Sequence, residues 1–85
     1  MRVIIPSALQ SYTGASRVEA AGATLAEVLD DLERRYPGIR FRMIDEQRGF
    51  RPHIRFFYER EPLRDLERPL EDDGELAIVQ ALSGG

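Results

Sequence analysis

Apolar and polar residues alternate along the first part of the chain, a pattern typical of β-strands. Residues 2–9 are expected to form a first strand, with Val3 and Ile5 on one face and Ile4 on the other. Pro6 should mark an edge or a kink, because proline cannot donate a hydrogen bond to a β-ladder. The chain is therefore expected to begin in a strand that buries one face.

A second strand is predicted over residues 17–20, with Val18 facing inward. The segment before it, residues 11–16, carries a turn centred on Thr13-Gly14. Two short strands joined by a glycine-containing turn are typical of a β-hairpin. We therefore expect the first two strands to pair antiparallel.

Residues 25–36 have the spacing of an amphipathic helix. Thr24 and Glu27 form a capping-box pattern at its start, and Pro37-Gly38 ends it. Its apolar residues follow the i, i+3, i+4, i+7 rule and predict one buried stripe: Leu25, Val28, Leu29, Leu32 and Tyr36.

The opposite face of this helix is charged. Two pairs at i, i+4 spacing, Asp30–Arg34 and Asp31–Arg35, are expected to form surface ion pairs. Such pairs are common and weak, so this run of charges predicts a solvent-exposed helix face and not a binding site.

Residues 39–50 are irregular, with one helical turn expected over 41–44 that places Phe41 and Ile44 in the core. Residues 53–58 alternate as a third strand. Its more apolar set should face the helix (Ile54, Phe56 and Tyr58), whereas Arg55 and Phe57 should face outward.

The last part of the chain is expected to hold a turn at 59–61, a short edge strand at 62–64, a loop at 65–74 and a final strand at 75–82. The loop should be held by Leu66, Pro69 and Leu70. In the final strand Leu76 and Ile78 should point inward, and the outward set should be Ala77, Val79 and Ala81.

This order of elements predicts an α+β fold in which one main helix crosses a mixed sheet of about five strands. The first and last strands should lie side by side and parallel at the centre. That arrangement is the β-grasp, or ubiquitin-like, roll. A ferredoxin-like roll would require a second full-length helix, and residues 39–50 suit one poorly.

Composition supports one small domain, residues 1–82, followed by a flexible tail at 83–85. The chain has 85 residues, of which 42% are hydrophobic, and a net charge of −3. We expect no membrane segment and no secretory signal, hence a cytoplasmic protein. The acidic balance disfavours nucleic acid as a partner, because nucleic-acid binding depends on neutralising phosphates.

Few side chains could support catalysis or bind a metal. Cysteine and lysine are absent, which excludes disulfides, thiolate sites and side-chain Schiff bases. The single histidine, His53, is assigned a structural or solvent-exposed role, since one histidine alone defines no site. Asp72 and Asp73 are interpreted as turn residues, and we expect no metal site.

The sequence ends in Ser83-Gly84-Gly85 directly after the last predicted strand. Two glycines make a thin, pliable tail that can enter a narrow channel of another protein. The terminal carboxylate, with a reference pKa of about 3.3–3.7, is ionised near neutral pH and could attack the α-phosphate of ATP. The chain has no glycine-rich phosphate loop, so a partner would have to bind ATP and Mg²⁺. A cloning remnant or a frayed end is the alternative interpretation.

Short stretches along almost the whole length of the sequence match a known pattern: Ile5-Pro6-Ser7, Thr13-Gly14, Thr24-Leu25, Leu32-Glu33, Tyr36-Pro37-Gly38-Ile39, Arg51-Pro52-His53-Ile54, Pro69-Leu70, Asp73-Gly74-Glu75 and Ser83-Gly84-Gly85. In these stretches the sequence resembles the ThiS/MoaD family of ubiquitin-like sulfur carriers. It differs at one turn, where many members have Asn-Gly or Asn-Asp and this chain has Glu59-Arg60.

The resemblance implies a carrier and not an enzyme. The Gly85 carboxylate would be adenylated by a ThiF/MoeB-like activating enzyme, which supplies the ATP and Mg²⁺, and converted to a thiocarboxylate. The sulfur would pass to an acceptor synthase. The subgroup linked to a cysteine synthase is favoured, and the small subunit of molybdopterin synthase, with its large subunit as acceptor, is the competitor.

Partners are expected to bind the tail and the outer sheet face. The residues assigned to this role are Arg55, Phe57, Ala77, Val79, Ala81, Leu82, Ser83 and Gly84. Two other hypotheses stay open at this point: a protein modifier that forms isopeptide bonds through the same tail, and a β-grasp docking module in which the Gly-Gly end is incidental.

Overall fold

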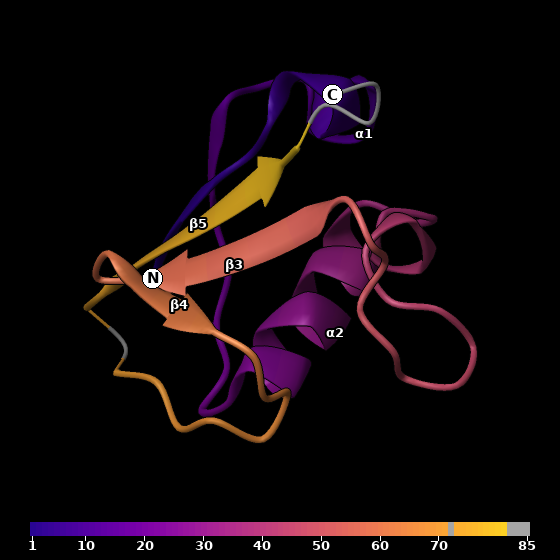
Figure 1. Ribbon diagram of the computed structural model, residues 1–85. Coiled ribbons are helices and arrows are strands. Elements are labelled where there is room, and N and C mark those ends of the chain that lie inside the picture. The colour runs from indigo at the N-terminus through magenta and orange to yellow at the C-terminus, as the bar shows by residue number, and fades with distance from the viewer. Residues whose placement is uncertain (72, 82–85) are drawn as a thin grey trace.

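The computed structural model describes residues 1–71 and 73–81, and it contains one mixed five-stranded sheet with strand order β2-β1-β5-β3-β4. The central strands β1 and β5 are parallel, and every other neighbouring pair is antiparallel. Helix α2 covers one face of the sheet (Figure 1). The elements, in chain order, are β1 (Arg2–Ile4), η1 (Ser7–Leu9), α1 (Gln10–Thr13), β2 (Arg17–Glu19), α2 (Leu25–Arg35), η2 (Arg40–Arg42), β3 (Ile54–Tyr58), β4 (Glu61–Leu63) and β5 (Glu75–Gln80).

This topology is the predicted β-grasp roll. The antiparallel hairpin is present, with Val3 opposite Val18, and the parallel central pair places Val3 opposite Leu76. A parallel pair needs a long crossover between its strands, and the segment containing α2 supplies it. The end of β5 therefore leaves the sheet from its centre.

The start of α2 forms as the capping box predicts. The Thr24 hydroxyl accepts a hydrogen bond from the Glu27 N–H at 3.2 Å, and the Glu27 carboxylate accepts one from the N–H of Ala23 at 3.1 Å. The glutamate thus reaches one residue before the cap, and both bonds satisfy backbone donors that lack a partner within the helix.

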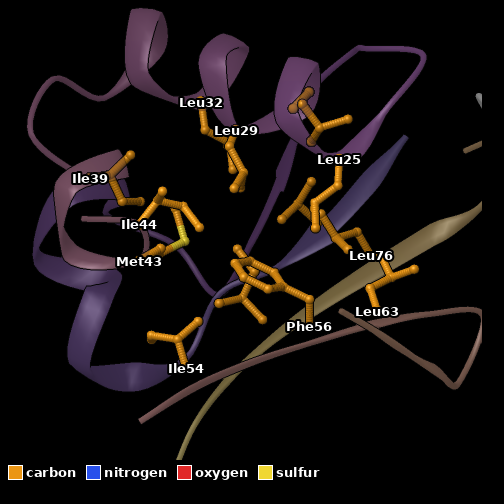
Figure 2. Close-up of a cluster of buried hydrophobic side chains, with 14 of the residues drawn as sticks. Leu25, Leu29, Leu32, Ile39, Met43, Ile44, Ile54, Phe56, Leu63 and Leu76 are labelled. Atoms are coloured by element: carbon orange, nitrogen blue, oxygen red, sulfur yellow. The ribbon is translucent and has the colours of Figure 1, made fainter. Parts of the chain in front are cut away.

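The core lies between α2 and the inner face of the sheet. Leu29, Leu32 and Leu76 are completely buried. In Figure 2 the leucines of α2 point toward the side chains of Ile54 and Phe56 on β3. The predicted inward residues of the last two long strands are confirmed, since Ile54, Phe56, Leu76 and Ile78 are all buried and Tyr58 packs against them.

The predicted first strand is too long. Strand β1 ends at Ile4, and residues 7–13, expected to be strand and turn, form the helical turns η1 and α1. Pro6, with φ −68°, precedes the first turn, and Gly14 ends the second in the left-handed region with φ 70°. The side-chain amide of Gln10 donates to the Ile5 carbonyl at 3.0 Å, which satisfies a carbonyl that the ladder leaves free.

The predicted role of Phe41 is wrong. The short helix η2 begins one residue earlier than expected, and Phe41 points outward with 57% of its surface exposed. Ile44 is buried as predicted, and Ile39 and Met43 are buried in place of Phe41. Side chains three residues apart eclipse in a 3₁₀ turn, so the one-residue shift changes which residues enter the core.

The charged face of α2 matches the prediction in part, because the predicted Asp31–Arg35 pair forms but Asp31 does not lie at the surface. Asp31 is buried, at 5% exposure, and binds both Arg34 and Arg35, the latter at 2.9 Å. Asp30 pairs with Arg40 at 3.0 Å and not with Arg34. One carboxylate of this face is therefore part of the interior.

Among the described residues, no helix has both the length and the apolar character needed to cross a membrane.

Strand β4 begins one residue earlier than predicted, at Glu61, and Leu66 and Leu70 are buried as expected. The final strand β5 ends at Gln80. The predicted tail at 83–85, and Leu82 before it, lie outside the described residues.

Candidate functional site

The outer face of the sheet, opposite α2, presents the outward residues of β3 and β5 beside one another. Phe57 lies directly opposite Ala77, and Arg55 lies opposite Val79. Phe57 is half-buried, whereas Val79 is 42% exposed. Side chains directly opposite across an antiparallel pair are about 4.5–5.5 Å apart at Cβ, so these residues form one continuous surface.

The apolar row extends across neighbouring strands. Ile4 of β1 is the parallel partner of Ala77, and Pro62 of β4 lies opposite Phe57. Neither Ile4 nor Pro62 was predicted to bind partners, although Ile4 was expected on the face opposite Val3 and Ile5. We call this set the outer apolar row: Ile4, Phe57, Pro62, Ala77 and Val79.

Ala81 continues the pairing beyond the end of β5. Its N–H donates to the carbonyl of His53 at 2.7 Å, and its side chain is exposed. This bond holds Ala81, the last residue that the structure describes, beside the start of β3. Leu82, Ser83, Gly84 and Gly85 were predicted to bind partners or react, and they lie outside the described residues.

The start of β5 is fixed by Tyr58. Its hydroxyl donates to the carbonyl of Glu71 and accepts from the N–H of the same residue, both at 2.8 Å. A Cβ at position 74 would overlap the Tyr58 ring, which explains glycine there. Together these contacts hold the loop that leads into the strand carrying Ala77 and Val79.

Strong carboxylate interactions lie away from the outer face. The pKa of Asp31 is lowered, first by a hydrogen bond from the Ala21 N–H and then by Arg35 and Arg34, against the opposing effect of burial. The pKa of Glu33 is lowered by the N–H groups of Gly38 and Arg40. Both carboxylates fasten loops to α2, so their roles are structural.

No cluster of three or more His, Cys, Asp or Glu side chains suited to a metal ion occurs in residues 1–71 and 73–81. His53 is exposed and contributes its backbone carbonyl to Ala81. What the described surface offers is an apolar face beside a strand end, an arrangement suited to binding another protein.

Comparison with known proteins identifies the family. The ThiS family model matches residues 3–85. The chain belongs to the ThiS family. Sulfur carrier protein CysO of Mycobacterium tuberculosis is 33% identical over 89 residues, which cover 98% of this chain and 96% of that protein. This member of the ThiS family thus matches that sulfur carrier over almost the whole length of both.

Solved structures of related proteins have the same fold as this chain. The crystal structure of the Amycolatopsis orientalis BexX/CysO complex contains a chain with 36% identity and a TM-score of 0.91, covering 99% of this chain and 98% of that one. SAMP1 from Haloferax volcanii has 26% identity and a TM-score of 0.80, covering 100% and 98%. The β-grasp prediction is therefore confirmed for this ThiS family member.

Proposed function

We propose that this ThiS family protein is a sulfur carrier whose Gly85 carboxylate is adenylated and then converted to a thiocarboxylate. The observation that carries the proposal is the family match, which includes the Ser83-Gly84-Gly85 end. Homology to the sulfur carrier CysO over almost the full length of both chains supports it. A carrier of this kind is a substrate of other enzymes and not a catalyst.

The chemistry needs only the terminal carboxylate of this chain. One carboxylate oxygen attacks the α-phosphorus of ATP, pyrophosphate leaves, and an acyl-adenylate forms. A sulfide-equivalent nucleophile then attacks the carbonyl carbon and displaces AMP, which leaves a C–S bond. An activating enzyme of the ThiF/MoeB kind would bind ATP and Mg²⁺, since the sequence has no glycine-rich phosphate loop and residues 1–71 and 73–81 hold no cluster of three or more His, Cys, Asp or Glu side chains suited to a metal.

The outer apolar row is the proposed docking surface for that enzyme. Phe57, Ala77 and Val79 lie on the strands that lead to the tail, with Arg55 beside them. A partner that covers this face receives the tail at the end of β5. In the BexX/CysO structure a CysO chain forms a complex with another protein, which supports a protein partner for this chain as well.

The sulfur acceptor is proposed to be a cysteine synthase-like protein. The relatives with 33% and 36% identity are both CysO proteins, which supports this choice over the large subunit of molybdopterin synthase. A second function, protein modification through an isopeptide bond, is supported by the likeness to SAMP1, a small archaeal modifier protein.

Mass spectrometry tests the carrier function. Incubated with ATP, Mg²⁺, an activating enzyme and a sulfur donor, the intact protein should gain the mass of one oxygen-to-sulfur exchange. A chain that lacks Gly85, or one extended beyond it by alanine, should not. Conversion of the shortened chain at the same rate contradicts the proposal, and covalent adducts to lysines in cell extracts would favour the modifier function.

A further inference from the structure

A hollow of about 300 Å³ lies beside the end of β5. It is formed by the last turn of η2, the segment before β3, and the final residue of β5. Its lining residues are Phe41, Arg42, Arg51, Pro52, His53, Ile54 and Gln80. The mechanism proposed above uses none of their side chains.

Arg51 is held in a fixed position over this hollow. Its Nε donates to the carbonyl of Phe41 at 3.0 Å, and its guanidinium carbon lies 4.4 Å from the centre of the Phe41 ring. This contact occupies one N–H of the guanidinium and leaves its terminal amino groups available to a ligand. Because the side chain is already ordered, binding an anion there costs little conformational entropy.

The surroundings of Arg51 are positively charged. Arg42 lines the same hollow, and Arg55 is held nearby by hydrogen bonds from Nη1 to the carbonyls of Pro52 and Ile54, at 2.7 and 3.0 Å. Across residues 1–71 and 73–81, no carboxylate lies within ion-pair distance of these three arginines.

Arg51 contributes to the lowered pKa of Asp45 as its smallest cause. The Asp45 Oδ1 accepts hydrogen bonds from the N–H groups of Gly49 and Gln47 at 2.8 and 2.9 Å, and these are the main causes of its lowered pKa. The carboxylate is thus committed to its own loop. Local positive charge remains at the hollow although the whole chain carries a net charge of −3.

The hollow lies close to Ala81, the last residue that the structure describes before the C-terminal tail. Gln80 lines the hollow and Ala81 follows it, bound to the carbonyl of His53. An enzyme that draws the last residues into its active site must come close to this end of the sheet. The exposed Phe41 ring adds an apolar contact beside the arginines.

We propose that an acidic surface of the enzyme that adenylates the tail docks on Arg42 and Arg51 beside Phe41, and on the neighbouring Arg55. This inference rests on the proposed function and adds an electrostatic contact to it. Charge pairs of this kind increase the association rate and select the partner. The net negative charge of the chain disfavours nucleic acid as the occupant, because phosphate binding requires a larger basic footprint.

Binding measurements with the full chain and an activating enzyme test the proposal. We expect Arg51→Glu to weaken the affinity by about tenfold or more at low salt. Arg51→Gln, which removes the charge without reversing it, should have a smaller effect in the same direction. Arg68→Glu is the matched control, since Arg68 is exposed on the loop at the other end of α2, where its carbonyl accepts from the Leu25 N–H.

The salt dependence of the affinity, measured together with thermal unfolding, distinguishes an electrostatic effect on binding from a loss of folding. Affinity of the unchanged protein should fall between about 0.05 and 0.5 M salt, because exposed charges are screened, and the Arg51→Glu affinity should fall less. Thermal unfolding should be similar for all variants. The proposal is overturned if Arg51→Glu and Arg68→Glu weaken binding to the activating enzyme equally. It is also overturned if Arg51→Glu weakens binding only to the sulfur acceptor, or if the protein binds a short oligo-uridylate through Arg51.

The same samples separate a failure of the docking contact from a failure of the carrier function. If the unchanged protein forms the thiocarboxylate and Arg51→Glu binds as tightly as it does, the carrier function stands and the docking contact is wrong. If the unchanged protein gains no sulfur and does not bind the enzyme, both proposals fail.

Discussion

Phe57 on β3 lies directly opposite Ala77 on β5, on the face of the sheet that α2 does not cover. This pair joins the third strand to β5, the strand that precedes the Gly-Gly end of the sequence. The Phe57 ring is half-buried and lies outside the core.

We expect Phe57→Ala to weaken binding to the activating enzyme by at least about tenfold, the scale of an aromatic anchor at an interface. Stability should change little, because the ring is not part of the core. Titration calorimetry and thermal unfolding measure the two effects. Arg17→Ala, on the edge strand β2, is the control, and a large fall in melting temperature with unchanged affinity would contradict the assignment.

Truncation to alanine should cost much more stability at Leu29 than at Phe41. Leu29 is completely buried, so Leu29→Ala should cost about 2–5 kcal/mol of unfolding free energy. Phe41 is 57% exposed, so Phe41→Ala should cost less than about 1 kcal/mol, mainly through its contact with Arg51. Urea unfolding compares them, and similar losses would show that the packing around η2 is misassigned.

Asp31 should make stability depend on pH in the acidic range. Its pKa is lowered in the folded protein below the ordinary value of 3.8, first by the Ala21 N–H and then by the arginines. A lowered pKa means that stability is fully present above the unfolded value and is lost as the pH falls through the folded one. Asp31→Asn should cost about 1.5–3 kcal/mol near pH 7, the scale of a hydrogen bond to a charged group.

The difference between Asp31→Asn and the unchanged protein should shrink below about pH 4 as the aspartate is protonated. Asp30→Asn provides a comparison, because Asp30 is exposed and surface ion pairs contribute about 0–1 kcal/mol. Denaturant unfolding at a series of pH values measures both. A loss that is independent of pH would rule out this role of the carboxylate.

In the turn between β3 and β4 a single substitution is expected to increase stability. Glu59 and Arg60 both have positive φ, 50° and 72°, and they connect Tyr58 and Glu61 as the two residues of a hairpin loop. Such type I′ turns favour Asn-Gly, since glycine adopts positive φ without a Cβ clash. Arg60→Gly should raise the unfolding free energy by about 1 kcal/mol.

Arg60→Ala is the control for this turn, because alanine keeps the Cβ and should bring no such gain. Binding to the activating enzyme should be unchanged in both variants, since the turn lies at the end of β3 far from Ala81 along the strand. A glycine variant that is no more stable than the alanine variant would show that the backbone is not strained there.

Local sequence patterns determine where the main helix begins and which faces of the helix and strands are buried. The capping box at Thr24 and Glu27, the stripe through Leu29, and the alternation along β3 each depend on residues close in sequence, so period and propensity suffice. The same alternation placed Phe57 and Val79 on the outer face. The Gly-Gly end and the family resemblance are properties of the sequence as well.

Tertiary structure decided what depends on contacts between distant segments. Asp31 is interior because its carboxylate binds the Ala21 N–H, ten residues away, at 2.9 Å. Phe41 is outside because η2 starts one residue early, and its ring then lies under Arg51. The pairing of β5 with β3 brings Gln80 beside these residues, so the basic hollow at the tail exists only in the folded chain.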